Sequence, residues 1–92
     1  MSTDSRRWHI SDRVAYEFVQ GEAVALNLKT GTYYRLNPTA ASALRQLARG
    51  AGLRDLTERL LEEFDVPRAN LVADLTDLVA DLERYDLIVR ES

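Results

Sequence analysis

Apolar positions along this chain change from a two-residue spacing to a helical spacing near residue 38. Residues 14–19 alternate apolar and aromatic side chains with others, which predicts a strand. A tight turn over residues 20–22 leads to a second expected strand at residues 23–28. Residues 32–36 have the aromatic and β-branched content of a third strand. Together these segments predict a three-stranded antiparallel meander.

Strand parity predicts which side chains of this sheet face the core. Val24, Leu26 and Leu28 share one face of the second strand. Tyr34 and Leu36 share one face of the third. We expect both sets to face inward.

Residues typical of turns and caps are found in the hairpin loop and at the start of the first expected helix. Gly31 is free to take the positive φ that closes a three-residue hairpin loop. Asn37 is an expected N-cap, and Pro38 suits the first helical position because its missing N–H costs nothing there.

Three helices follow in the prediction. Their expected bounds are residues 38–49, 53–64 and 67–84. Gly50 and Gly52 end the first helix, and Asp65 and Pro67 begin the third as its N-cap and an early helical position. A short final strand is expected at residues 87–89. The inward positions expected in the first two helices are Ala40, Leu44, Leu47, Ala48, Leu53, Leu56, Leu60 and Phe64.

The third helix carries an unusually wide apolar surface. At 100° per residue its apolar positions cover roughly 140°, whereas one core-facing stripe needs only about 100°. This helix is therefore expected to have two apolar neighbours, the core and a second partner. The positions are Leu71, Val72, Leu75, Leu78, Val79, Leu82 and Tyr85.

Length and composition indicate one domain. The 92 residues are 46% hydrophobic and 29% charged, with a net charge of −3 and no cysteine. We expect residues 1–11 to form a flexible segment, ordered only where Trp8 and Ile10 find apolar contacts, and residues 12–92 to form the domain. No apolar run suits a signal peptide or a membrane span, so a cytoplasmic protein is expected. We also expect a monomer.

Catalytic patterns are nearly absent from the sequence. His9 is the only histidine, and no Cys/His spacing suits a metal. Asp74, Asp77 and Asp81 recur along the third helix as either a solvated face or an acidic rim that steers a basic partner. The sequence therefore predicts a protein that is not an enzyme and needs no cofactor or metal.

The third strand is expected to be an open sheet edge. It contains no proline and one charge, Arg35, so its unpaired N–H and C=O groups are a template for another chain. Tyr33 points away from Tyr34 and Leu36 by parity. It is either an ordinary sheet aromatic or a contact for an added peptide.

Two segments carry a family resemblance. LNLKTGTYYRLNPTAA from Leu26 and ADLTDLVADLERYDLI from Ala73 resemble the PqqD family, whose peptide recognition elements bind leader segments of ribosomally made, modified peptides. The resemblance covers about residues 12–90. Asp86 stands where the family pattern usually has glycine. The resemblance implies an α+β, winged-helix-like fold with a three-stranded antiparallel sheet followed by three helices.

The resemblance also implies a binding site. The leader would add as an antiparallel strand beside the third strand, in a groove made with the third helix. Val72 and Asp81 are second choices, because the sequence does not tell which edge of that helix faces the groove. The implied peptide-binding residues are Thr32, Tyr33, Tyr34, Arg35, Leu36, Asp74, Leu75, Leu78 and Val79.

The implied function is that of a free-standing leader-binding protein. In a lasso-peptide pathway it would deliver the precursor to a separate leader peptidase and a cyclase. The alternative is a peptide chaperone in pyrroloquinoline quinone biosynthesis. A winged-helix DNA-binding module is less favoured. Residues 67–86 have only Arg68 and Arg84 against five carboxylates, whereas recognition helices usually carry excess positive charge.

Overall fold

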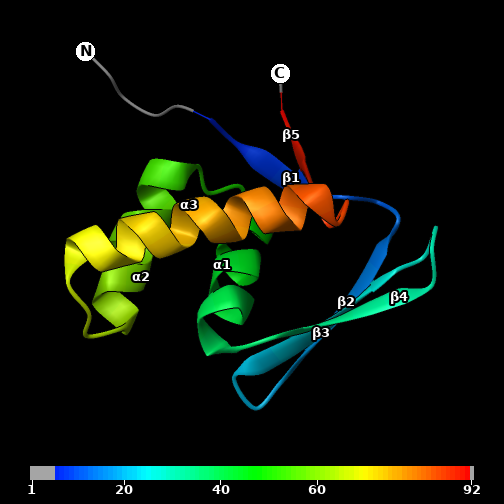
Figure 1. Ribbon diagram of the computed structural model, residues 1–92, viewed down its shortest axis with the longest axis horizontal. Helices are drawn as coiled ribbons and strands as arrows, with labels where there is room; N and C mark the ends of the chain where they lie inside the picture. Colours follow the sequence, from blue (N-terminus) through cyan, green and yellow to red (C-terminus); the bar gives the residue numbers. More distant parts are fainter. Residues whose placement is uncertain (1–5, 92) are drawn as a thin grey trace.

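The computed structural model describes residues 6–91 and has an α+β fold in which antiparallel strands precede three helices (Figure 1). The elements are β1 (Trp8–Ile10), β2 (Val14–Val19), β3 (Glu22–Asn27), β4 (Thr32–Leu36), α1 (Pro38–Ala48), α2 (Leu53–Glu63), α3 (Arg68–Arg84) and β5 (Ile88–Arg90). The predicted meander is confirmed as a sheet of order β2-β3-β4. The three predicted helices are also confirmed, and the arrangement is consistent with a winged-helix-like fold.

A second sheet joins the two ends of the described chain. β1 pairs antiparallel with β5, with Ile10 opposite Ile88. Trp8 is only 1% exposed, so it and Ile10 do find the apolar contacts that would order this segment. The short final strand expected at residues 87–89 is confirmed as β5, whereas the sequence prediction contained no strand at residues 8–10. Residues 1–5 of the expected flexible segment lie outside the described residues.

The inward face of β3 differs from the prediction. Ala23 and Ala25 are buried, whereas Val24 and Leu26 are half-buried on the opposite face and Leu28 is exposed beyond the end of the strand. The prediction that these larger residues face the core is therefore wrong. Ala23 and Ala25 pair with Leu36 and Tyr34, the residues of β4 that do face inward, and their small side chains let α1 pack closely against the sheet.

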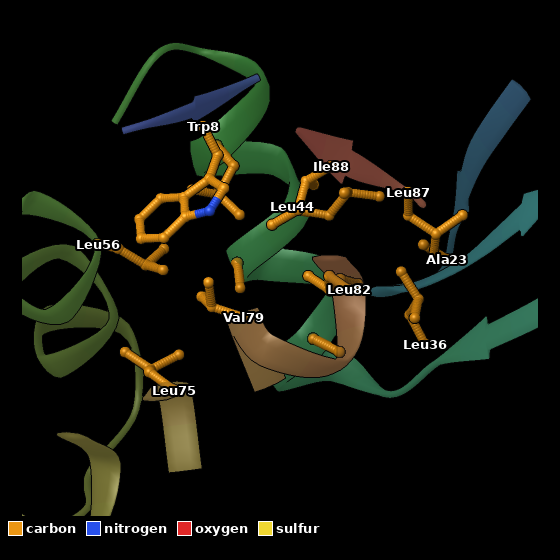
Figure 2. Packing of buried hydrophobic residues seen from close by; sticks show 14 of the residues in the cluster. Trp8, Ala23, Leu36, Leu44, Leu56, Leu75, Val79, Leu82, Leu87 and Ile88 are labelled. Atoms are coloured by element: carbon orange, nitrogen blue, oxygen red, sulfur yellow. The ribbon is translucent and has the colours of Figure 1, made fainter. Parts of the chain in front are cut away.

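The core lies where α1 meets the other helices and both sheets. Figure 2 shows Trp8, Leu44, Leu56 and Leu82 converging from four elements, with Leu36 entering from the meander. All four converging side chains are at most 1% exposed. The N-terminal strand is therefore part of the core.

Local signals set the ends of α1 and of the β3–β4 hairpin. Asn37 is the N-cap as predicted, and its Oδ1 accepts a hydrogen bond of 2.9 Å from the Ala40 N–H. Gly31 has the predicted positive φ of 78°, but the loop spans the four residues 28–31 because Leu28 lies outside the strand. Ala48, expected inward, is exposed at the last turn of α1.

The ends of α3 also differ from the prediction. Pro67, not Asp65, takes the N-cap position, without a side-chain hydrogen bond. At the other end, Asp86 has a φ of 60° and the Leu87 N–H donates to the Leu82 carbonyl at 3.0 Å. The Asp86 N–H donates to the Glu83 carbonyl, which completes a Schellman motif with Asp86 at its left-handed position. This position accounts for the glycine of the family pattern.

Candidate functional site

The main-chain groups of β4 are divided between β3 and the open edge. The Leu28 N–H donates to the Arg13 carbonyl, toward β2, and the register of β3 is continuous on both sides. By alternation, the main-chain groups of Ala25 point to β4 and pair with Tyr34. The N–H and C=O groups of Tyr33 and Arg35 therefore point to the edge, which no other strand among residues 6–91 covers.

The side chains of β4 follow the same alternation. Tyr33 is 68% exposed on the outer face of the sheet, where it lies opposite Leu26. Arg35 shares that face, with its Nη2 3.7 Å from a carboxylate oxygen of Glu22. Thr32 is exposed at the start of the strand. The outward side chains are thus accessible next to the open edge.

The inward side chains of β4 are less available to a partner. Leu36 is 7% exposed and belongs to the core. Tyr34 is half-buried, and its ring stacks on that of Tyr85 with centroids 4.5 Å apart and planes 19° from parallel. Of the five predicted β4 contacts, Tyr33, Arg35 and Thr32 are therefore the exposed ones.

A hollow of about 220 Å³ opens at the end of β4, between the start of α1 and the middle of α3. We call it the α1–α3 hollow. Its lining residues are Asn37, Thr39, Ala40, Asp74 and Leu78. Asn37 follows Leu36 directly, so the hollow adjoins the end of β4.

The α1–α3 hollow contains two of the four predicted α3 residues. Asp74 is exposed and Leu78 is half-buried, four residues apart on one helix face. Leu75 and Val79, expected as pocket walls, are 0% and 4% exposed and pack in the core. Their side chains therefore present almost no surface to a partner.

The two edges of the wide apolar arc of α3 lie on different sides of the helix. Val72 is 43% exposed and lies at the edge of the arc opposite Leu78. Asp81 lies on the same side as Leu78, seven residues after Asp74. The structure thus separates the two second choices, with Asp81 on the hollow side of the helix and Val72 on the other.

Three lining residues were missed by sequence reasoning. Asn37, Thr39 and Ala40 were assigned only to the helix start and the core. A signal was present, because a cap directly after an open edge strand places the first turn of a helix beside that edge.

Both arginines of α3 form ion pairs with carboxylates. Arg68 lies 2.7 Å from Glu58, and Arg84 lies 2.5 Å from Asp81. The hydrogen bond from Arg68 lowers the pKa of the Glu58 carboxyl. Asp74 and Asp77 are exposed, so the helix presents net negative charge beside the hollow. A polyanion would be repelled there.

Residues 6–91 contain neither a metal-binding cluster nor a membrane-spanning helix. This part of the chain holds no cluster of three or more His, Cys, Asp or Glu side chains that could bind a metal ion. None of its helices is long and apolar enough to cross a membrane. His9 lies on the surface, with Nδ1 3.4 Å from Glu91.

Comparison with known proteins identifies the family. The profile of the family described as Coenzyme PQQ synthesis protein D (PqqD) matches residues 22–88. The chain belongs to the PqqD family. A search of curated proteins gave no match. The PqqD match begins with β3, so it includes β4 and every residue that lines the α1–α3 hollow.

Two solved structures share the fold of this PqqD-family chain. One is TbiB1 in complex with the TbiA(beta) leader peptide, at 29% sequence identity and a TM-score of 0.82, covering 87% of this chain and 93% of TbiB1. The other is a lasso peptide synthetase B1 complexed with the leader peptide, at 24% identity and a TM-score of 0.80. That match covers 90% of this chain and 98% of the synthetase chain.

Proposed function

We propose that this protein binds the leader segment of a ribosomally synthesised precursor peptide by strand addition. The observation that carries the proposal is the open edge of β4, where the main-chain groups of Tyr33 and Arg35 point outward beside the α1–α3 hollow. An added peptide gains main-chain hydrogen bonds at the edge, and its alternate side chains reach adjacent surfaces. TbiB1, a leader-peptide complex 29% identical to this chain, supports the same class of ligand.

In this proposal, main-chain and side-chain groups make different contacts with the leader. The backbone from Thr32 to Leu36 pairs with the leader, and Tyr33 and Arg35 contact its side chains. Leu78 supplies an apolar wall and Asp74 a carboxylate in the hollow. Tyr34 contributes through its exposed part, while Leu36, Leu75 and Val79 support the site from the core.

We further propose that the protein is a cytoplasmic monomer that delivers the bound precursor to separate enzymes in lasso-peptide biosynthesis. The leader peptidase and then the cyclase carry out the chemistry, and this chain acts only in binding. The fold shared with a lasso peptide synthetase B1 agrees with this setting. The pyrroloquinoline quinone pathway has only the family description in its favour.

A titration distinguishes leader binding from DNA binding. Fluorescence polarisation of a labelled precursor leader and a labelled duplex is measured at low and high salt. We expect saturable leader binding with modest salt dependence, because few charges are neutralised. DNA binding would weaken steeply, with a log–log slope of about −0.9 per phosphate contacted. Tight, salt-sensitive duplex binding without leader binding would refute the proposal.

A further inference from the structure

Asn27 is a buried polar residue at the end of β3 whose side chain makes three hydrogen bonds. It is 3% exposed. Its Oδ1 accepts from the N–H groups of Lys29 and Thr30, at 2.9 and 3.2 Å. Its Nδ2 donates to the Tyr85 carbonyl at 3.1 Å. The acceptor side therefore holds the β3–β4 loop, while the donor side reaches α3 across 58 residues of sequence.

Tyr85 receives a second contact from the same sheet. It is the C-cap of α3, so its carbonyl lies beyond the regular helical hydrogen bonds and needs another donor. Its ring stacks on Tyr34 of β4. Asn27 and Tyr34 thus attach both the main chain and the side chain of Tyr85 to the meander.

These contacts join two parts of the molecule that otherwise pack on different neighbours. β3 and β4 pack mainly on α1, whereas α3 packs mainly on α2 and β5. Figure 1 shows the meander to one side of the helices, with the C-terminal end of α3 nearest to it. The open edge belongs to the first part, and Asp74 and Leu78 of the hollow belong to the second.

We propose that Asn27 is a positioning residue for leader binding. Its bond to Tyr85 fixes the meander relative to α3, and so places the open edge of β4 in line with the α1–α3 hollow before a peptide arrives. A peptide that uses both surfaces then binds without the cost of ordering them. This inference rests on the proposed function.

The discriminating substitution is Asn27→Asp. A carboxylate keeps the acceptors for Lys29 and Thr30 but loses the donor to Tyr85, and it brings negative charge against the carbonyl oxygen. We expect leader affinity to fall about tenfold, the loss expected for about 1.4 kcal/mol. Leu60→Val serves as control, because it removes a methylene from the α2 core away from the site.

A distance measurement separates positioning from general destabilisation. The chain contains no cysteine, so Lys29→Cys and Asp77→Cys together allow two specific spin labels. Without peptide, Asn27→Asp should broaden the distance distribution between loop and helix, and saturating leader should narrow it. Leu60→Val should leave the distribution unchanged. Asn27→Ala, which also removes the donor to Tyr85 but adds no negative charge, is the second variant if Asn27→Asp does not fold, and it too should broaden the distribution.

The two proposals fail in distinguishable ways. If the parental protein does not bind leader, the proposed function is wrong. If the parental protein binds and a folded Asn27→Asp variant binds equally well, the positioning role is wrong and the function stands. The positioning role is also wrong if the distance distribution is not broadened in either variant. It is equally wrong if Leu60→Val and Asn27→Asp lose the same stability and the same leader affinity.

Discussion

Tyr33 and Tyr34 are consecutive in β4, but their side chains lie on opposite faces of the sheet. Tyr33 is 68% exposed opposite Leu26, while Tyr34 stacks on Tyr85. Their main-chain groups alternate as well, with those of Tyr33 directed to the open edge and those of Tyr34 to β3. One strand therefore alternates between groups accessible at the open edge and groups that make structural contacts, so substitutions at neighbouring residues can test the two sets separately.

Proline substitution tests the open edge. Tyr33→Pro or Arg35→Pro removes an N–H directed outward and keeps the pairing with β3, so leader binding should be lost in a folded domain. Circular dichroism should match the parental spectrum, and fluorescence polarisation measures binding. Tyr34→Pro is the control, because it removes an N–H of the β3 ladder and should unfold the meander. A folded Tyr33→Pro variant that binds at parental strength would exclude strand addition.

A charge in the α1–α3 hollow tests the second surface. Leu78→Asp should weaken leader binding by about 1–2 kcal/mol, because it puts a carboxylate against an apolar anchor position. Val72→Asp places the same charge on the opposite edge of α3 and should leave binding unchanged. Equal effects of the two substitutions in titration calorimetry would remove the hollow from the site.

Leu75 tests the assignment of the inner face of α3 to the core. Leu75→Ala should lower the free energy of unfolding by about 2–5 kcal/mol, since the side chain is fully buried. Urea denaturation measures the change. A loss of leader affinity without loss of stability would instead return Leu75 to the binding surface.

The exit of α3 offers a stabilising substitution. Asp86→Gly should raise the free energy of unfolding by up to about 1 kcal/mol, because the left-handed conformation costs a residue with a Cβ more than glycine. Asp86→Ala should lower the free energy of unfolding. Both variants lose the carboxylate, so the comparison between them isolates the backbone effect. A destabilised glycine variant in urea denaturation would contradict this account of the Schellman motif.

Trp8 tests whether the N-terminal strand belongs to the folding unit. Trp8→Ala should cost about 3–5 kcal/mol of stability, because the indole is buried in the core. Its Nε1 has no hydrogen-bond partner among residues 6–91, so Trp8→Phe should cost clearly less. Thermal unfolding followed by circular dichroism compares the two. Parental stability of Trp8→Ala would restrict the domain to residues after β1.

The sequence by itself determined the elements whose signals are local. Asn37 and Pro38 specify the start of α1 because a cap needs only its own first turn. Gly31 marks the hairpin because positive φ is a property of one residue. The edge strand could also be predicted, because its residue types and its place at the end of the meander are both visible in the chain.

The tertiary structure decided the features that depend on packing between several elements. β3 has apolar residues on both faces, so only packing against α1 could select Ala23 and Ala25 over Val24 and Leu26. The apolar arc of α3 is wider than one core-facing stripe needs, so the edge of the arc that lines the hollow depends on where β4 ends. Trp8 entered the core because β5, about eighty residues away, pairs with its strand. Such contacts depend on sizes and distances between segments, which local residue patterns do not contain.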